Sequence, residues 1–140
     1  TAADNQDRYS EDSPARLMLF FDGDKGTLPV REQMLMETAH MLTGQELPYA
    51  TLMYVWENRF ATETVLRNNF TRQVKMIVVG TGRDRIGAWK SFPRNYGAAS
   101  RRACGADPGR LVGIGIMTDT DNTGESVESF YGAIVLKRVP

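Results

Sequence analysis

The chain has 140 residues, with 17 basic and 17 acidic side chains and a formal net charge of zero at pH 7. Hydrophobic residues make up 41% and charged residues 24%, as in ordinary soluble globular proteins, so the composition argues against a disordered or fibrous chain. The length predicts a single domain over residues 1–140, and the balanced charge argues against nucleic acid as a partner, because phosphate backbones require a basic surface.

Three apolar runs predict the centre of a sheet. Residues 15–22 and 74–80 carry apolar side chains on both faces, which is typical of central, covered strands. Residues 49–57 alternate, with Leu52, Tyr54 and Trp56 on one face. The polar residues 1–14 are expected to form a loop that leads into the first strand.

One surface helix is expected at about residues 28–43. Pro29 is suited to a first helical turn, and Gly44 is a normal helix-ending residue. Val30, Met34 and Met41 recur at helical spacing, so we expect this apolar stripe to pack on the sheet.

The second half of the chain predicts further strands and one short helix. Residues 86–92 are expected to form a short edge strand, followed by a helical piece around residues 98–103. Two alternating apolar strands are then expected on either side of the loop 119–125, the second over residues 130–136. With about six strands that are not interleaved with helices, the favoured class is mainly antiparallel β.

The loop between the last two predicted strands is rich in oxygen ligands. Asp119, Asp121, Asn122 and Glu125 offer the hard oxygen atoms that calcium prefers. The similarity to an EF-hand loop fails at its twelfth position, which is Phe130 instead of glutamate. The competing interpretation is a turn in which these side chains accept hydrogen bonds from loop amides without any metal.

An aromatic surface is the other candidate binding site. Tyr54, Trp56 and Asn58 project from one face of their strand, a pattern that could stack against a sugar, and Trp89 lies on the expected edge strand. Core packing produces the same pattern. No catalytic residue can be assigned, although Glu57, together with two carboxylates of the acidic loop, could act as acid or base.

The single cysteine, Cys104, excludes an intrachain disulfide and any zinc site with several thiolates. No apolar run approaches the roughly 20 residues of a membrane span.

Several segments resemble one family. They are EDSPAR (11–16), FDGDKG (21–26), YATLMYVWENR (49–59), VKMIVVGTG (74–82), IGIMTDTDNTGES (114–126) and YGAIVL (131–136). Together they resemble the C-terminal portion of the bacterial domain-of-unknown-function family 3047. The resemblance implies a periplasmic or secreted β-sandwich of jelly-roll type, similar to carbohydrate-binding modules, and it implies no activity.

The resemblance also implies a leader and several strands ahead of this segment. We therefore expect the chain to be the C-terminal part of a cleaved, larger sandwich, with the N-terminal fragment of the same protein as its partner. The expected function is binding of a carbohydrate or cell-envelope ligand. Calcium, bound at Asp119 to Glu125, is the one candidate cofactor. A polysaccharide-directed hydrolase or lyase, using carboxylates or a cleavage-exposed Thr1, is the alternative, and a purely structural or protein-interaction module is the third.

Overall fold

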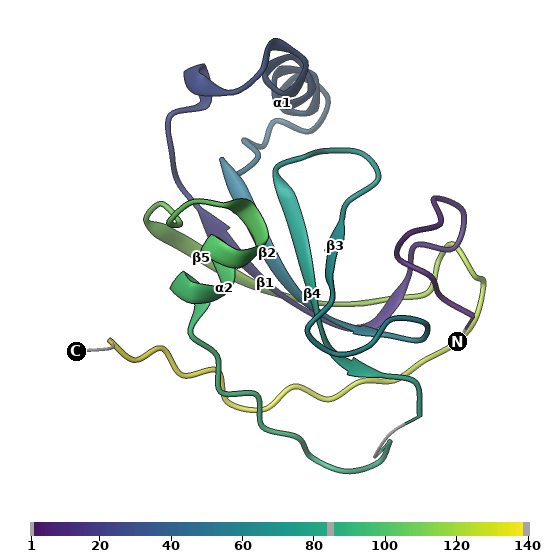
Figure 1. The fold of residues 1–140 in the computed structure, drawn as a ribbon. Coiled ribbons are helices and arrows are strands. Elements are labelled where there is room, and N and C mark those ends of the chain that lie inside the picture. Colours follow the sequence, from purple (N-terminus) through teal and green to yellow (C-terminus); the bar gives the residue numbers. More distant parts are fainter. Residues whose placement is uncertain (1, 84–85, 139–140) are drawn as a thin grey trace.

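The computed structural model describes residues 2–83 and 86–138. The elements in chain order are β1 (Ser13–Phe21), η1 (Lys25–Thr27), α1 (Val30–Thr43), β2 (Ala50–Glu57), β3 (Val65–Arg67), β4 (Val74–Thr81), α2 (Tyr96–Cys104) and β5 (Leu111–Asp119). The described strands form one open sheet in the order β3-β4-β2-β1-β5 (Figure 1). The mainly β class is confirmed, and so are the central positions of β1 and β4.

The sheet is mixed: three of its four described strand pairings are antiparallel, as the mainly antiparallel expectation requires, and one is parallel. β1 pairs antiparallel with both β2 and β5, but β2 pairs parallel with β4. The short strand β3, which the sequence did not predict, runs antiparallel to β4 at the edge of the sheet. Because β3 carries the chain back along the sheet, β4 can enter between β3 and β2 in the direction of β2. No helical crossover is needed for this parallel pair.

Each face of the sheet carries its own apolar cluster. Leu19, Leu52, Tyr54 and Ile77 are buried on the face that α2 covers, and Ala99 of α2 packs against them. The opposite face holds a second buried cluster, made of Val55, Leu66, Met76 and Val78. The two-sided apolar run of β4 therefore reflects burial on both faces, as the sequence predicts, whereas Met18 and Phe20 on the second face of β1 are only half-buried.

Both helices begin and end at recognisable residues. The side chain of Asn95 accepts a hydrogen bond from the Ala98 N–H at the start of α2. Helix α1 ends at Gly44, whose φ of 70° is left-handed and whose N–H donates to the His40 carbonyl at 2.8 Å. The predicted helix at residues 28–43 and the helical piece near residues 98–103 are therefore confirmed.

The expected packing of α1 on the sheet is wrong. Val30, Met34 and Met41 of its apolar stripe are 70%, 65% and 77% exposed. Figure 1 shows α1 beyond the ends of the strands instead of on a face of the sheet. The loop and η1 that follow β1 carry the chain away from the sheet before the helix begins. The apolar stripe therefore faces solvent in the described chain.

Two predicted strands are absent from the described residues. Residues 86–92 form turns and irregular structure, and residues 130–136 are extended without backbone pairing. The latter segment is tied to the sheet by side chains, since the Tyr131 hydroxyl donates to the Met117 carbonyl at 2.6 Å. Figure 1 shows this segment, in yellow, running past the sheet. Alternating apolar residues fit an extended chain, but a strand also requires a neighbouring edge with the right register.

The described residues form one sheet and not the two packed sheets of the expected sandwich. β5 is the edge strand next to β1, and its C-terminal end at Asp119 lies beside the start of β1, where the candidate site is found. Within residues 2–83 and 86–138, no helix combines the length and apolar character needed to cross a membrane.

Candidate functional site

Two acidic segments that lie far apart in the sequence meet at one end of the sheet. The antiparallel register of β1 and β5 places Ser13 opposite Asp119. Asp12 immediately precedes β1, and Asp121 follows β5 by two residues. The strand pairing therefore brings the carboxylates of both segments together.

The loop after β5 is held by one of these carboxylates. Gly124 adopts a left-handed φ of 66°, and its N–H donates to the Thr120 carbonyl at 3.0 Å. The carboxylate of Asp12 accepts the backbone N–H of Asn122 at 3.3 Å and that of Thr123 at 2.7 Å. The Asx-type network that the sequence allowed is thus present, but its acceptor comes from the segment before β1.

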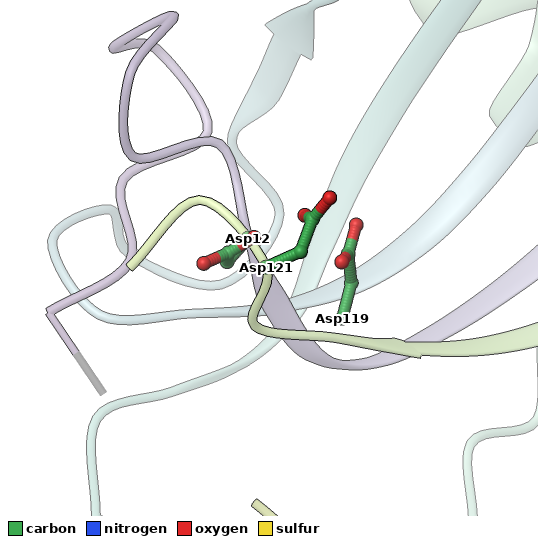
Figure 2. Close-up of side chains that lie close together, drawn as sticks. All are labelled: Asp12, Asp119 and Asp121. Carbon is green, nitrogen blue, oxygen red and sulfur yellow. The ribbon is translucent and has the colours of Figure 1, made fainter. Parts of the chain in front are cut away.

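Three carboxylates converge at this end. Asp12, Asp119 and Asp121 each offer one oxygen, and these three oxygens lie within 4.8 Å of one another. Figure 2 shows the carboxyl groups of Asp119 and Asp121 side by side, with Asp12 next to them on the adjoining segment. Two oxygens bound to one calcium ion are each about 2.4 Å from it, so they can be at most about 4.8 Å apart. The cluster therefore satisfies the distance limit for a shared cation.

Arg16 lies beside the cluster and is almost completely buried. One of its terminal nitrogens forms an ion pair with Asp119 at 3.4 Å, where the two side chains are only 7% and 15% exposed. The other donates to the Asn5 side-chain oxygen at 3.2 Å and to the Glu11 carbonyl at 3.4 Å. Its Nε is buried and has no hydrogen-bond partner among the described residues. The guanidinium therefore positions Asp119 and ties it to residues 2–12, which are called the N-terminal segment below.

The carboxyl groups of Asp119 and Asp12 have pKa values shifted in opposite directions. Burial, followed by the hydrogen bond with Asp121, raises the pKa of Asp119, although the charge of Arg16 opposes this. Burial also acts to raise the pKa of Asp12, but hydrogen bonds from Thr123 and Asn122 outweigh it, so this pKa lies below its usual value. Asp12 is therefore an anchoring anion, and Asp119 is the carboxyl that holds a proton more readily.

A buried carboxylate at the end of β2 extends this polar region. Glu57 is 1% exposed and accepts four hydrogen bonds from other residues that the structure describes. Asn5 provides two of them, from its backbone N–H at 3.2 Å and its side-chain amide at 2.6 Å. The backbone N–H groups of Asn58 and Arg59 provide the others, at 2.7 and 3.4 Å. Glu57 therefore fastens the N-terminal segment to the sheet.

Glu11 makes a similar attachment to the loop after β3. Its two oxygens accept hydrogen bonds from the side-chain amides of Asn68 at 2.9 Å and Asn69 at 3.3 Å. Burial raises the pKa of Glu11, and the Asn69 hydrogen bond opposes that shift. The N-terminal segment thus joins β2, β5 and the loop after β3 into one polar site.

The protein comparisons place the chain in a family. The model of a family described as "Protein of unknown function (DUF3047)" matches residues 1–135. The chain belongs to this family. The resemblance found in the sequence is therefore confirmed. No curated protein and no solved structure gave a match, so the chemistry of this DUF3047 domain has to be argued from its own residues.

The predicted metal ligands of the DUF3047 domain are only partly brought together. Asp119 and Asp121 belong to the cluster of three carboxylates. The Asn122 side-chain amide instead donates to the Glu11 carbonyl at 3.0 Å, and the Glu125 carboxylate accepts the Ala2 N–H at 2.6 Å. Asn122 and Glu125 therefore attach the loop to the N-terminal segment in this structure.

The four residues of the predicted aromatic surface do not form one exposed platform. Tyr54 is buried at 6% exposure, within the cluster beneath α2, while Trp89 is 74% exposed. Trp56 is half-buried, and its indole N–H donates to the Gly82 carbonyl at 2.9 Å. Asn58 is half-buried, and its side-chain amide donates to the Ala3 carbonyl at 3.1 Å. Of the four, Trp89 has the side chain most accessible to a ligand.

Sequence reasoning missed the contributions of Asn5, Asp12 and Arg16. Residues 1–14 were expected only to form a loop that leads into the first strand, yet Asn5 and Asp12 are completely buried. The one signal was the acidic pair at residues 11–12 directly before a strong strand. Its significance depends on β5 being the neighbour of β1, which the local pattern does not specify.

Proposed function

We propose that this DUF3047 domain is a ligand-binding module of the cell envelope, periplasmic or secreted, which binds a carbohydrate or envelope component at the loop 119–125 with the help of calcium. The observation that carries the proposal is the cluster of Asp12, Asp119 and Asp121, in which one carboxylate oxygen of each residue lies within 4.8 Å of the other two. The extracytoplasmic location is supported by the family resemblance. Calcium sites of extracellular modules bind at about 10⁻⁴–10⁻³ M, a range that a partly formed site can reach.

The chemistry of these residues supports calcium over a transition metal. All three side chains offer carboxylate oxygens, whereas zinc and copper favour imidazole and thiolate ligands. Asp12 still has lone pairs available after accepting two loop N–H groups. When bound, calcium would supply a positive centre to which ligand hydroxyl groups can coordinate. Arg16 already pairs with Asp119, so the ion must share this carboxylate with a guanidinium, which favours weak binding.

The test measures thermal unfolding of this protein and its binding to a glycan array. Each measurement is made once with calcium and once with a chelator. Calcium is expected to raise the melting temperature, because a ligand of the native state stabilises it. Asp119→Asn and Asp121→Asn should abolish this rise and reduce glycan binding. Since the pKa of Asp119 is raised by burial, protons compete with calcium at this carboxyl, so the calcium-induced rise should shrink as the pH falls.

Asp107→Asn is the matched control, because Asp107 is an exposed aspartate that pairs with Arg101 outside the cluster. It should respond to calcium as the native protein does. An unchanged melting curve with calcium and chelator would contradict the calcium site. An array without hits would contradict carbohydrate as the ligand.

A polysaccharide-directed hydrolase or lyase is the second candidate, favoured by the opposite pKa shifts of Asp119 and Asp12. The hydrogen bonds that Asp12 accepts from the Asn122 and Thr123 N–H groups weigh against hydrolysis, because they commit this carboxylate to the loop. Polysaccharide turnover that is lost in Asp119→Asn would favour the enzyme. Catalysis by Thr1 falls outside the described residues.

The same proposal includes a jelly-roll sandwich, in which further strands of the same protein complete the sheet at β5. β5 is an edge strand whose Val112, Ile114 and Ile116 are 52%, 37% and 51% exposed. Exposed apolar edge strands readily pair with further strands. The proposed partner is the N-terminal part of the same protein. Size-exclusion chromatography with intact-mass analysis should find both pieces together, and a lone, folded, monomeric chain of these residues would contradict this partner.

A further inference from the structure

A pocket of about 270 Å³ opens on the face of the sheet that α2 covers. It is lined by β2, the loop between β2 and β3, β4, the residues just before α2, and α2 itself. The residues that matter for its chemistry are Tyr54, Glu63, Ile77, Arg94, Ala98 and Arg102. Because the residues of the acidic cluster do not line this pocket, it is a separate site from the one proposed above.

The floor of the pocket contains a buried hydroxyl group. Tyr54 is 6% exposed, and its hydroxyl has no hydrogen-bond partner among the described residues. Burial raises the pKa of Tyr54, so the hydroxyl remains a hydrogen-bond donor at neutral pH. The guanidinium of Arg94 lies 6.0 Å from the centre of the tyrosine ring and helps to cover it. An incoming oxygen atom would reach the hydroxyl when the Arg94 side chain shifts.

The wall of the pocket carries two cations and one anion. Glu63 accepts a hydrogen bond from Arg94 with one carboxylate oxygen and from Arg102, at 2.9 Å, with the other. The Arg94 hydrogen bond is the main reason that the pKa of Glu63 lies below its usual value, so this carboxylate is ionised at neutral pH. One positive charge therefore remains uncompensated in the pocket, which matches a ligand with a single negative charge.

The backbone around the pocket favours the same kind of ligand. Glu63 has a left-handed φ of 70°, a conformation that non-glycine residues rarely adopt, and its N–H donates to the Val78 carbonyl at 2.7 Å. This strained conformation holds the carboxylate between the two arginines. Ala98 in the first turn of α2 also lines the pocket, where the helix dipole attracts negative charge.

We propose that this pocket binds a small organic monocarboxylate, whose carboxylate takes hydrogen bonds from Arg94, Arg102 and the Tyr54 hydroxyl while its carbon skeleton packs on Ile77 and Ala98. A monoanion suits the single uncompensated charge better than the dianion of phosphate does. The apolar side chains favour a ligand with a carbon body over an inorganic anion. The volume is slightly below the roughly 300–1,000 Å³ of pockets for drug-sized ligands, so the ligand is small.

The test is a calorimetric titration of the intact protein with sodium acetate, sodium benzoate and sodium glucuronate, beside glucose and inorganic phosphate. At least one carboxylate is expected to bind saturably, and more tightly than glucose or phosphate does. Tyr54→Phe and Arg102→Gln should each weaken this binding by about tenfold, since each removes one donor to a charged group. Glu63→Gln should tighten it, because both arginines lose their competing carboxylate.

Arg101→Gln is the control, because Arg101 lies on the same helix but pairs with Asp107 outside the pocket. Its affinity should equal that of the native protein. Circular dichroism checks the fold, and Tyr54→Phe is a mild substitution because it removes only an unpaired hydroxyl. The proposal would be overturned if none of the three carboxylates bound saturably. It would also be overturned if phosphate bound more tightly than every carboxylate. Loss of binding in Arg101→Gln would also overturn the assignment to this pocket.

Discussion

Replacing Glu57 with alanine is expected to lower the free energy of unfolding by about 3 kcal/mol. The native carboxylate is completely buried and accepts four hydrogen bonds. In the alanine variant, two donors of Asn5 and the backbone N–H groups of Asn58 and Arg59 lose their acceptor. Each unsatisfied buried donor costs about 1–3 kcal/mol, but water entering the new cavity recovers part of the sum.

The variant series separates this hydrogen bonding from side-chain volume. Glu57→Gln keeps the side-chain volume but provides only one accepting oxygen. Its free energy of unfolding should therefore lie between those of the native protein and Glu57→Ala. Glu46→Ala is the control, since Glu46 is a glutamate with a 74% exposed side chain, paired with Lys25 at the surface, and it should change stability little. Urea unfolding measures all three. Equal stability of Glu57→Ala and Glu46→Ala would show that the buried network does not hold the N-terminal segment.

Replacing Arg16 with methionine is expected to cost about 2–3 kcal/mol at neutral pH. Methionine fills much of the same space, so the loss comes mainly from the guanidinium. Asp119 then remains 15% exposed without its ion-pair partner, and the Asn5 side chain loses a donor. Removing one member of a buried ion pair is costly because the other charge stays poorly solvated.

The pH dependence of this variant follows from Asp119. Burial raises the pKa of Asp119, whereas the charge of Arg16 lowers it. The attraction to Arg16 exists only while Asp119 is ionised, so it is present above the pKa of Asp119 and is lost as the pH falls through it. The stability difference between native protein and Arg16→Met should therefore shrink on acidification.

Arg110→Met is the matched control for this ion pair. Arg110 pairs with Asp22 at 3.1 Å, but the two side chains are 79% and 51% exposed. Exposed pairs of this kind contribute little to stability. If Arg16→Met and Arg110→Met had the same effect in urea unfolding, the burial of the Arg16 pair would have no energetic consequence.

The central strands could be predicted because their apolar pattern is local. β1, β2 and β4 each show the alternation or two-sided run of a covered strand, and α1 ends at a left-handed glycine. β3 was missed because three residues carry too little periodicity. Residues 130–136 were wrongly predicted as a strand, since alternation describes an extended chain but does not provide a pairing edge.

Half of the candidate site could be found from the sequence. Asp119 and Asp121 stand out in one oxygen-rich loop, as a local cluster of possible ligands. Asp12 and Arg16 do not, because they lie beside Asp119 only through the pairing of β1 with β5. Arg16 and Asp119 are 103 positions apart in the sequence. The pocket beneath α2 was also not predicted, because Tyr54, Glu63 and Arg102 come from three separate segments.

The sequence by itself determined the class of secondary structure, the helix ends, the family and the acidic loop, because these depend on residues within a few positions of one another. The tertiary structure decided the strand order, the parallel pair β2–β4, the exposure of α1 and the assembly of both candidate sites. These features depend on which edges pair and which charged groups become buried together. Those choices are made by the free energy of the whole chain, so no local pattern specifies them.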